Sequence, residues 1–323
     1  MTQMTRRSLF AGAAAVSAAT ALTPLAVRNA FAAAPAGIKG SGIYAYKIGD
    51  YEIVQLLDGA RTFDMPDGFV VNASKDKAIA AAEAAYMPGG KLTVPFNPMI
   101  INTGSKLVAI DTGNGLGAFA ANKGIVGQAR GNMEIAGIDP KSVDIVLISH
   151  FHGDHIGGLK NADGTPAYPN AEIKVPAAEL AFWSDDANQS KANGFNKNQF
   201  AGVKKNIDGL KFTPFEPNKE VAPGITSIDT PGHTPGHTSF VVASGSGKMI
   251  VQGDVCNIPS LFMRNADFQA VFDNDPNLTI ATRKRFFDMV SAEKMLIAGY
   301  QFPFPALGHV EKDGTNYRLV PGI

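Results

Sequence analysis

The chain has 323 residues, 45% of them hydrophobic, and its 29 basic and 29 acidic side chains give a formal net charge of zero. A balanced charge excludes the basic face that nucleic-acid binding requires. The single cysteine, Cys256, excludes an internal disulfide framework and a multi-cysteine zinc site. We interpret Cys256 as a small buried hydrophobe.

The N-terminal segment is typical of an export signal. Residues 5–10 read Thr-Arg-Arg-Ser-Leu-Phe, a weakly hydrophobic run follows over 11–27, and residues 30–32 form a small-x-small cleavage site. The run is too short and too interrupted for a stable membrane anchor. We therefore expect 1–32 to be a signal peptide for the twin-arginine export machinery, and the protein to be periplasmic or secreted. The remaining 291 residues carry 26 basic and 29 acidic side chains.

The rest of the chain predicts one domain. Residues 33–42 read as a flexible leader and 43–323 as a single folded domain. Strands are expected over 44–57, 98–102, 106–111, 143–148, 171–175, 224–228, 239–242, 248–252 and 295–298. Helices are expected over 75–86, 117–136, 177–183 and 276–291, and a polar surface loop or lid over 184–200. Many strands with interspersed helices predict an α/β fold (α+β in some schemes), with two sheets packed together and helices outside, an αββα sandwich.

One motif carries most of the chemistry. His150-Phe151-His152-Gly153-Asp154-His155 places three imidazoles and a carboxylate directly after an apolar strand. His150 and His152 can converge on one divalent ion, and Asp154 and His155 on a second. Two ions held about 3.5–4 Å apart form a site that makes hydroxide at neutral pH.

Three further segments repeat the same layout, in which an apolar run ends, small residues turn the chain and a ligand type follows. They are residues 230–237, which contain His233 and His237, then Gly253-Asp254, and then Gly308-His309. Ligands at the ends of neighbouring strands can gather at one edge of a fold.

The pattern resembles the metallo-β-lactamase-fold hydrolases, over about residues 49–320. The His-x-His-x-Asp-His signature is followed by intervals of 78 residues to His233, 21 to Asp254 and 55 to His309, and residues 103–113, 230–237 and 302–309 also match. Within that superfamily the chain is most similar to the methyl parathion hydrolase-like branch, which shares a signal peptide and a C-terminal Phe-Pro-x-x-Gly-His followed by Gly-x-x-Tyr-Arg.

The resemblance implies a ligand set and a mechanism. His150, His152 and His233 would bind a first metal, Asp154, His155 and His309 a second, and Asp254 would bridge both. Asp154 and Asp254 would be the catalytic carboxylates, the two divalent ions would be zinc, with Mn, Co or Fe as alternatives, and a metal-bridging hydroxide would be the nucleophile. A homodimer is also implied.

Residues around the cluster have candidate supporting roles. Asp111 is either an outer partner that orients a ligand imidazole or a turn-forming residue, and His237 is either an outer partner or a packed core histidine. Trp183, Phe195, Phe262 and Phe272 are candidates for a substrate pocket, although Trp183 could instead pack a helix on a sheet.

These features predict a binuclear metal-dependent hydrolase of a small-molecule substrate with an ester, lactone or aryl phosphotriester bond. An N-acyl-homoserine lactonase, which would quench quorum signals, is the alternative in close chemistry, followed by a β-lactamase. A mono-iron persulfide dioxygenase needs only the first metal's ligands, so an intact second site argues against it. Carbon and phosphorus remain open as the atom attacked.

Overall fold

The computed structural model describes residues 42–87, 90–192 and 194–322. The predicted signal peptide, 1–32, and all but the last residue of the predicted leader, 33–42, lie outside the described residues. The described residues form one compact unit. None of the helices in the described ranges is both long enough and apolar enough to cross a membrane.

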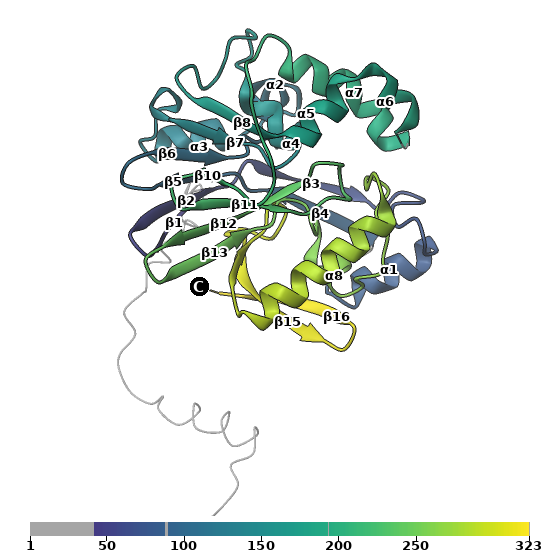
Figure 1. The fold of residues 1–323 in the computed structure, drawn as a ribbon. Helices are drawn as coiled ribbons and strands as arrows, with labels where there is room; N and C mark the ends of the chain where they lie inside the picture. The colour runs from purple at the N-terminus through teal and green to yellow at the C-terminus, as the bar shows by residue number, and fades with distance from the viewer. Residues whose placement is uncertain (1–41, 88–89, 193, 323) are drawn as a thin grey trace, which may run out of the picture. The chain divides into compact units, whose positions relative to one another are not determined.

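Two seven-stranded sheets form the centre of this unit (Figure 1). The first sheet has the order β1 (Ile43–Ile48), β2 (Tyr51–Leu56), β5 (Met99–Asn102), β6 (Leu107–Ile110), β7 (Ile145–Leu147), β8 (Glu172–Pro176) and β9 (Thr213–Phe215). The second has the order β10 (Glu220–Ala222), β11 (Ile225–Asp229), β12 (Thr238–Ser244), β13 (Gly247–Val251), β14 (Leu296–Ala298), β15 (Leu307–Asp313) and β16 (Asn316–Pro321). Both sheets are mixed, since β6, β7, β8 and β9 pair in parallel, as do β13 and β14.

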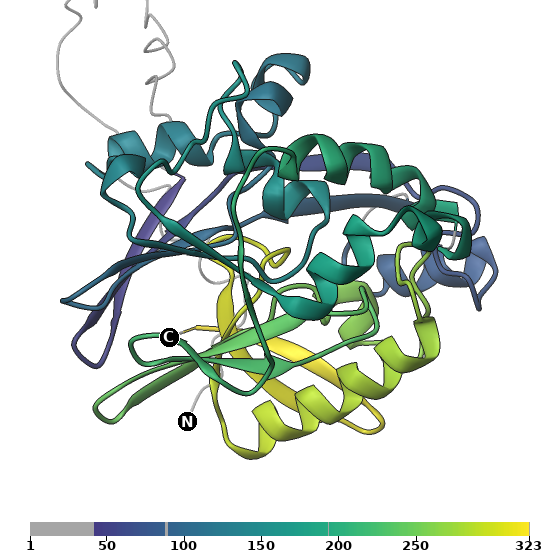
Figure 2. The same cartoon turned by 45° about the horizontal axis from the view of Figure 1, so that its top comes forward.

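Three apolar layers hold the sheets and helices together. Side chains of both sheets, among them Ile53, Ile101, Phe240 and Met249, are buried between the sheets. The outer face of the first sheet packs against α3 (Ala129–Ile135), α5 (Ala177–Ser184) and α7 (Gly194–Ile207), and the outer face of the second against α1 (Lys75–Glu83) and α8 (Pro276–Ala292). Figure 2 shows the helices on either side of the two sheets. The arrangement confirms the predicted αββα sandwich.

Shorter elements complete the fold. They are the helices α2 (Gly115–Ala121), α4 (Gly153–Ile156) and α6 (Asp186–Lys191), the 3₁₀ turns Pro140–Ser142 and Gly157–Leu159, the π-helical turn Pro259–Met263, and a separate hairpin of β3 (Gly59–Asp64) and β4 (Lys91–Phe96). Local chemistry sets the limits of several helices. For example, the Asp275 side chain accepts a hydrogen bond from the Leu278 amide and Pro276 occupies the first turn of α8, both of which favour a helix start.

The structure corrects three element predictions. Residues 184–200 are not a loop, because α6 and the first half of α7 occupy most of them. The predicted helix over 117–136 is two helices, α2 and α3, separated by a segment in which Gly124 and Gly127 both have positive φ. The strands of the β3–β4 hairpin, like β9, β10, β15 and β16, were not predicted.

Candidate metal centre

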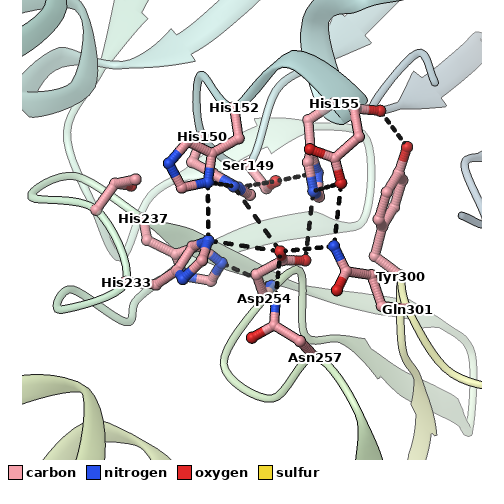
Figure 3. Close-up of polar contacts among 12 residues, drawn as sticks. Ser149, His150, His152, His155, His233, His237, Asp254, Asn257, Tyr300 and Gln301 are labelled. Carbon is pink, nitrogen blue, oxygen red and sulfur yellow. Dashed lines mark hydrogen bonds and ion pairs between the residues drawn. The ribbon is translucent and has the colours of Figure 1, made fainter. Parts of the chain in front are cut away.

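The polar residues of the four sequence motifs meet at one edge of the sandwich. The first sheet contributes the segment after β7, which carries His150, His152 and His155. The second sheet contributes His233 from the β11–β12 loop and Asp254 from the end of β13. Figure 3 shows these side chains pointing toward one another. The sandwich therefore brings together residues that are about a hundred positions apart in the chain.

Three imidazoles form a first group of donors. His152 Nδ1 lies 3.1 Å from His150 Nε2 and 3.0 Å from His233 Nε2, and all three side chains are buried. Burial first, and then the neighbouring imidazoles, lower the pKa of His150 well below its usual value. Burial, followed by His233, lowers the pKa of His152 to about 3. Both rings are therefore neutral at pH 7, which is the form that ligates a metal.

A second group of donors lies beside the first. His155 Nε2 is 3.3 Å from Asp254 Oδ1 and 3.4 Å from Asp154 Oδ2, while Asp254 Oδ2 is 3.5 Å from His233 Nε2. Asp254 thus lies between the two groups. Burial alone would lower the pKa of His155, but Asp254, Asp154 and Asp111 outweigh it and hold this pKa well above its usual value. Several carboxylates around one buried ring create a strong demand for a cation.

Outer hydrogen bonds direct each imidazole toward the centre. His155 donates from Nδ1 to Asp111 Oδ2 at 2.8 Å, His233 donates from Nδ1 to Asp273 Oδ1 at 2.9 Å, and His152 donates from Nε2 to Asn196 Oδ1 at 2.7 Å. Each of these contacts turns the opposite nitrogen of the ring toward the centre.

Asp111 and His237 lie next to this centre. Asp111 also accepts hydrogen bonds from the amide and hydroxyl of Ser149, and its φ of 56° lies in the left-handed region, so it both turns the chain and orients His155. His237 accepts the Asp254 amide at Nε2, 2.8 Å away. A Cβ on Gly253 would lie 2.7 Å from His237 Nε2, so only glycine allows this approach.

His309 does not belong to either group of donors. Ile297 pairs with Gly308 and Ala298 with Leu307, so β15 runs away from the metal edge and places His309 opposite the start of β14. The prediction that His309 is a ligand is therefore wrong. Instead Gln301, which follows the end of β14, donates from Nε2 to Asp154 Oδ2 at 3.0 Å and to Asp254 Oδ2 at 3.1 Å.

A cavity of about 990 Å³ opens above the two groups. Its floor contains His152, Asp154, His233, Asp254 and Gln301, and its walls include the aromatic side chains of Phe63, Phe69, Phe96, Phe195 and Phe272. Three cationic side chains, Arg61, Lys160 and Lys205, also border it. Two of these aromatic residues, Phe195 and Phe272, come from the predicted set.

Trp183 and Phe262, the other two residues of that set, do not line this cavity, which corrects their prediction as pocket residues. Trp183 is fully buried between α5 and the first sheet and donates its indole N–H to Glu179. Phe262 is fully buried in the core around α8. Large aromatic side chains close to a site often pack into the nearest apolar layer and do not face the cavity.

Several residues of the site were not found from the sequence. Asp273 and Asn196 hold His233 and His152, but each is a single polar residue in a segment without a ligand motif. Gln301 had a usable signal, because it lies two residues after Gly299, which ends the apolar run Leu296-Ile297-Ala298. Arg61 and Phe63 belong to the unpredicted β3–β4 hairpin.

The donors fit divalent metal ions. His150, His152 and His233 form one group whose ligand atoms all lie within 4.8 Å of one another, and His155, Asp254 and His150 form another. His155 Nε2 and Asp254 Oδ1 are buried without a hydrogen-bond partner among the described residues. Buried polar atoms are almost always satisfied, so these two atoms indicate a ligand that coordinates both. Imidazole nitrogen and carboxylate oxygen are typical zinc ligands.

Comparison with known proteins agrees with this geometry. Residues 95–292 match the model of the metallo-beta-lactamase superfamily. An N-acyl homoserine lactonase of Bacillus thuringiensis is 25% identical over 236 residues, which cover 68% of this chain and 85% of the lactonase.

Solved structures show the same fold. The hydrolase AbOPH superposes with a TM-score of 0.79 and 26% identity over 88% of this chain and 99% of AbOPH. AidC, a dizinc quorum-quenching lactonase, superposes with a TM-score of 0.78 and 22% identity over 88% of this chain and 98% of AidC.

Proposed function

The chain belongs to the metallo-beta-lactamase superfamily, and from this membership we propose that it is a metal-dependent hydrolase of lactones and aryl esters. One observation carries the proposal. Members of both groups of metal-ligating side chains line a cavity to which five phenylalanine side chains also contribute. A reactive floor beneath apolar walls suits a substrate with one electrophilic carbonyl and a flat or apolar remainder.

We assign one ion position to each group of donors. His150, His152 and His233 would hold one divalent ion, and Asp154, His155 and Asp254 a second, with zinc as the native metal. When bound, such ions supply a water activated at neutral pH and polarise the carbonyl oxygen.

A carboxylate at the metal centre would transfer a proton to the leaving oxygen. An opened lactone leaves an alkoxide oxygen that must be protonated before the product departs. Asp254 lies between both groups of donors and borders the cavity, and Asp154, whose side chain is 20% exposed, borders it too. The Asn257 side chain donates to Asp254 Oδ2 at 2.8 Å and fixes the orientation of that carboxylate. Asp254 is therefore the carboxylate to which we assign the proton transfer.

The cavity walls suggest which chemical group the substrate carries beside its scissile bond. The Phe195 ring packs against His152 at a centroid distance of 5.8 Å and against Phe272 at 6.0 Å, so both rings stand at the edge of the metal centre. Aromatic rings at this position favour a flat aryl group or an acyl chain beside the scissile bond. An N-acyl homoserine lactone, with its apolar chain, is a second candidate, and the similarity to the Bacillus lactonase favours it.

A matched substrate panel tests the proposal. We would measure kcat/KM of the zinc-loaded protein on an aryl lactone, an aryl ester, an N-acyl homoserine lactone, an aryl phosphotriester and a β-lactam. Highest turnover of the aryl lactone or the aryl ester supports the proposal, and a preference for the homoserine lactone supports the second candidate. Highest turnover of the phosphotriester or the β-lactam would overturn the assignment to carboxylic esters.

We also propose that the protein acts outside the cytoplasm, since residues 5–10 carry the twin-arginine pattern. Fractionation of cells that express the full chain tests this, with an Arg6→Lys, Arg7→Lys double variant as the control. The wild type is expected in the periplasm or medium and the variant in the cytoplasm. Equal distribution of the two would contradict export by this route.

A further inference from the structure

Hydrogen bonds and ring packing on both sides hold Gln301 in place beside the second group of donors. Asn97 is buried and donates from Nδ2 to the carbonyl oxygens of Tyr300 and Phe302, both at 2.8 Å, which fixes the backbone on either side of Gln301. The Tyr300 ring stacks on His155 at a centroid distance of 3.8 Å, and its hydroxyl donates to the Asp154 carbonyl oxygen. Gln301 itself is 7% exposed. Its contacts with the carboxylates are therefore set by the fold.

The Gln301 carboxamide shares an oxygen with the second group. Asp154 Oδ2, which lies 3.4 Å from His155 Nε2, is also the atom that accepts a hydrogen bond from Gln301. The other N–H of the same amide reaches Asp254 Oδ2. Gln301 thus bridges the carboxylates of Asp154 and Asp254 without adding charge, and an ion at the second group must compete with these two hydrogen bonds.

The ligand chemistry of the two groups is unequal as well. The first group offers three imidazoles, whereas the second, apart from the shared His150, offers one imidazole, two carboxylates and an amide. Amide oxygen is a weak ligand for zinc compared with imidazole, and suits harder ions such as Mn²⁺. The superfamily resemblance predicts a seventh strong ligand for the second ion, and His309 does not supply it.

We infer that the two ion positions are unequal, and that the three-histidine position binds zinc tightly while Gln301 makes the second position weak and exchangeable. Gln301 acts here as a residue that sets metal stoichiometry. The inference concerns metal binding alone, so it is tested separately from the substrate class.

Metal titration of chelator-treated protein tests the inference. We would equilibrate the protein at a series of free zinc concentrations and measure the bound zinc per chain by inductively coupled plasma mass spectrometry. Cobalt binding would be followed by the visible absorption of the bound ion. The wild type is expected to show two binding steps separated by about 100-fold or more in affinity. Two steps of equal affinity in the wild type would overturn the inference without any variant.

Two substitutions at Gln301 sharpen the test. Gln301→His supplies an imidazole of similar reach, and Gln301→Glu supplies a carboxylate of the same shape; each is expected to tighten the second step by about 10-fold or more. Circular dichroism checks that each variant is folded. The matched control is His309→Gln, which is expected to leave both steps unchanged. Loss of a step in His309→Gln, or an unchanged second step in both folded Gln301 variants, would contradict the assignment.

Discussion

Single side chains in this centre act through the atoms that do not face the metal position. His233 turns Nε2 inward because its Nδ1–H is held by Asp273, and Asp273 in turn lies beside the buried guanidinium of Arg283, 3.7 Å from its Nη2. A carboxylate behind a ligand imidazole fixes the tautomer and increases the basicity of the ring. Asp273 is therefore a positioning residue for the three-histidine position.

Replacement of Asp273 tests this role. In Asp273→Asn the charge behind His233 is lost, so we expect about 10- to 100-fold weaker metal binding at the three-histidine position, with the second position changed less. Competition with a chromogenic chelator measures the affinity. Asp267→Asn, at an exposed carboxylate paired with Lys284, is the control and should bind metal as the wild type does. Unchanged affinity in folded Asp273→Asn would refute the positioning role.

Cys256 gives a second prediction at this scale. Its side chain is fully buried, and burial raises the pKa of its thiol to about 12. The thiolate is the reactive form, so the native protein should not react with a thiol reagent at about pH 8. The denatured protein should react with one equivalent of the reagent per chain. A spectrophotometric thiol assay with and without denaturant measures this. Fast labelling of native protein would show that Cys256 is accessible.

Only some residues of the metal centre can be predicted from the spacing of residues in the sequence. His150, His152 and His155 were predictable because their spacing is itself the signal. The role of Gln301 was not predictable, because both His309 and Gln301 lie within two residues of a glycine that ends an apolar run. Only the pairing of β14 with β15 decides which of the two side chains reaches the metal centre.

At the scale of elements, α5 is fixed to the β11–β12 loop through Glu179. This buried carboxylate accepts hydrogen bonds from Trp183 and from the Thr234 hydroxyl, one residue after His233. Burial raises the pKa of Glu179 to about 8, against the hydrogen bonds from Trp183 and the backbone, which lower it. The helix and the loop are thus joined by a group that keeps its proton at neutral pH.

This link predicts a pH dependence of stability. The folded state holds the Glu179 proton up to a pKa of about 8, while the unfolded chain releases it near the ordinary glutamate pKa of 4.5, so the folded state binds more protons in between. The free energy of unfolding should therefore fall as the pH rises from about 5 through about 8. Urea unfolding at several pH values measures the slope.

Glu179→Gln provides the comparison, because its neutral amide cannot titrate. The slope of the free energy of unfolding against pH should be flatter in the variant than in the wild type over this window. Parallel slopes would show that Glu179 does not keep its proton in the fold.

The helices and strands could be predicted where apolar residues recur at a regular spacing, and could not where polar residues interrupt that spacing. The hairpin of β5 and β6 and the long helix α8 were predicted within a few residues. The asparagine-rich composition of residues 184–200 predicts a loop, yet Asn196, Phe200 and Val203 repeat at helical spacing and form the buried face of α7. The β3–β4 hairpin was missed because its strands lie on either side of α1, at a sequence distance that pattern alone does not bridge.

For the whole molecule, the stability of the site depends on the layer between the two sheets. The first sheet supplies the His150 segment and the second supplies His233 and Asp254, so the metal centre exists only while the sheets are packed together. The sequence predicted two layers of strands from its apolar runs. The order of strands within each layer could not be predicted, because it depends on pairings between distant segments.

A substitution in this layer should be costly. Phe240 is fully buried between the sheets, so Phe240→Ala is expected to lower the free energy of unfolding by about 3–5 kcal/mol. Denaturant unfolding at fixed metal concentration measures the change. Ile135→Ala, at a side chain that is 72% exposed, is the control and should change stability by at most about 0.5 kcal/mol. Similar losses in both variants would contradict the proposed importance of the inter-sheet layer.

The most direct test of the central claim is the rate of lactone hydrolysis as a function of bound metal per chain. Chelated protein should be inactive, activity should return as zinc is added back, and His152→Ala should remain folded but not recover. Chelated protein that keeps more than about a tenth of the wild-type kcat/KM, or full recovery in His152→Ala, would contradict metal-dependent hydrolysis at this centre.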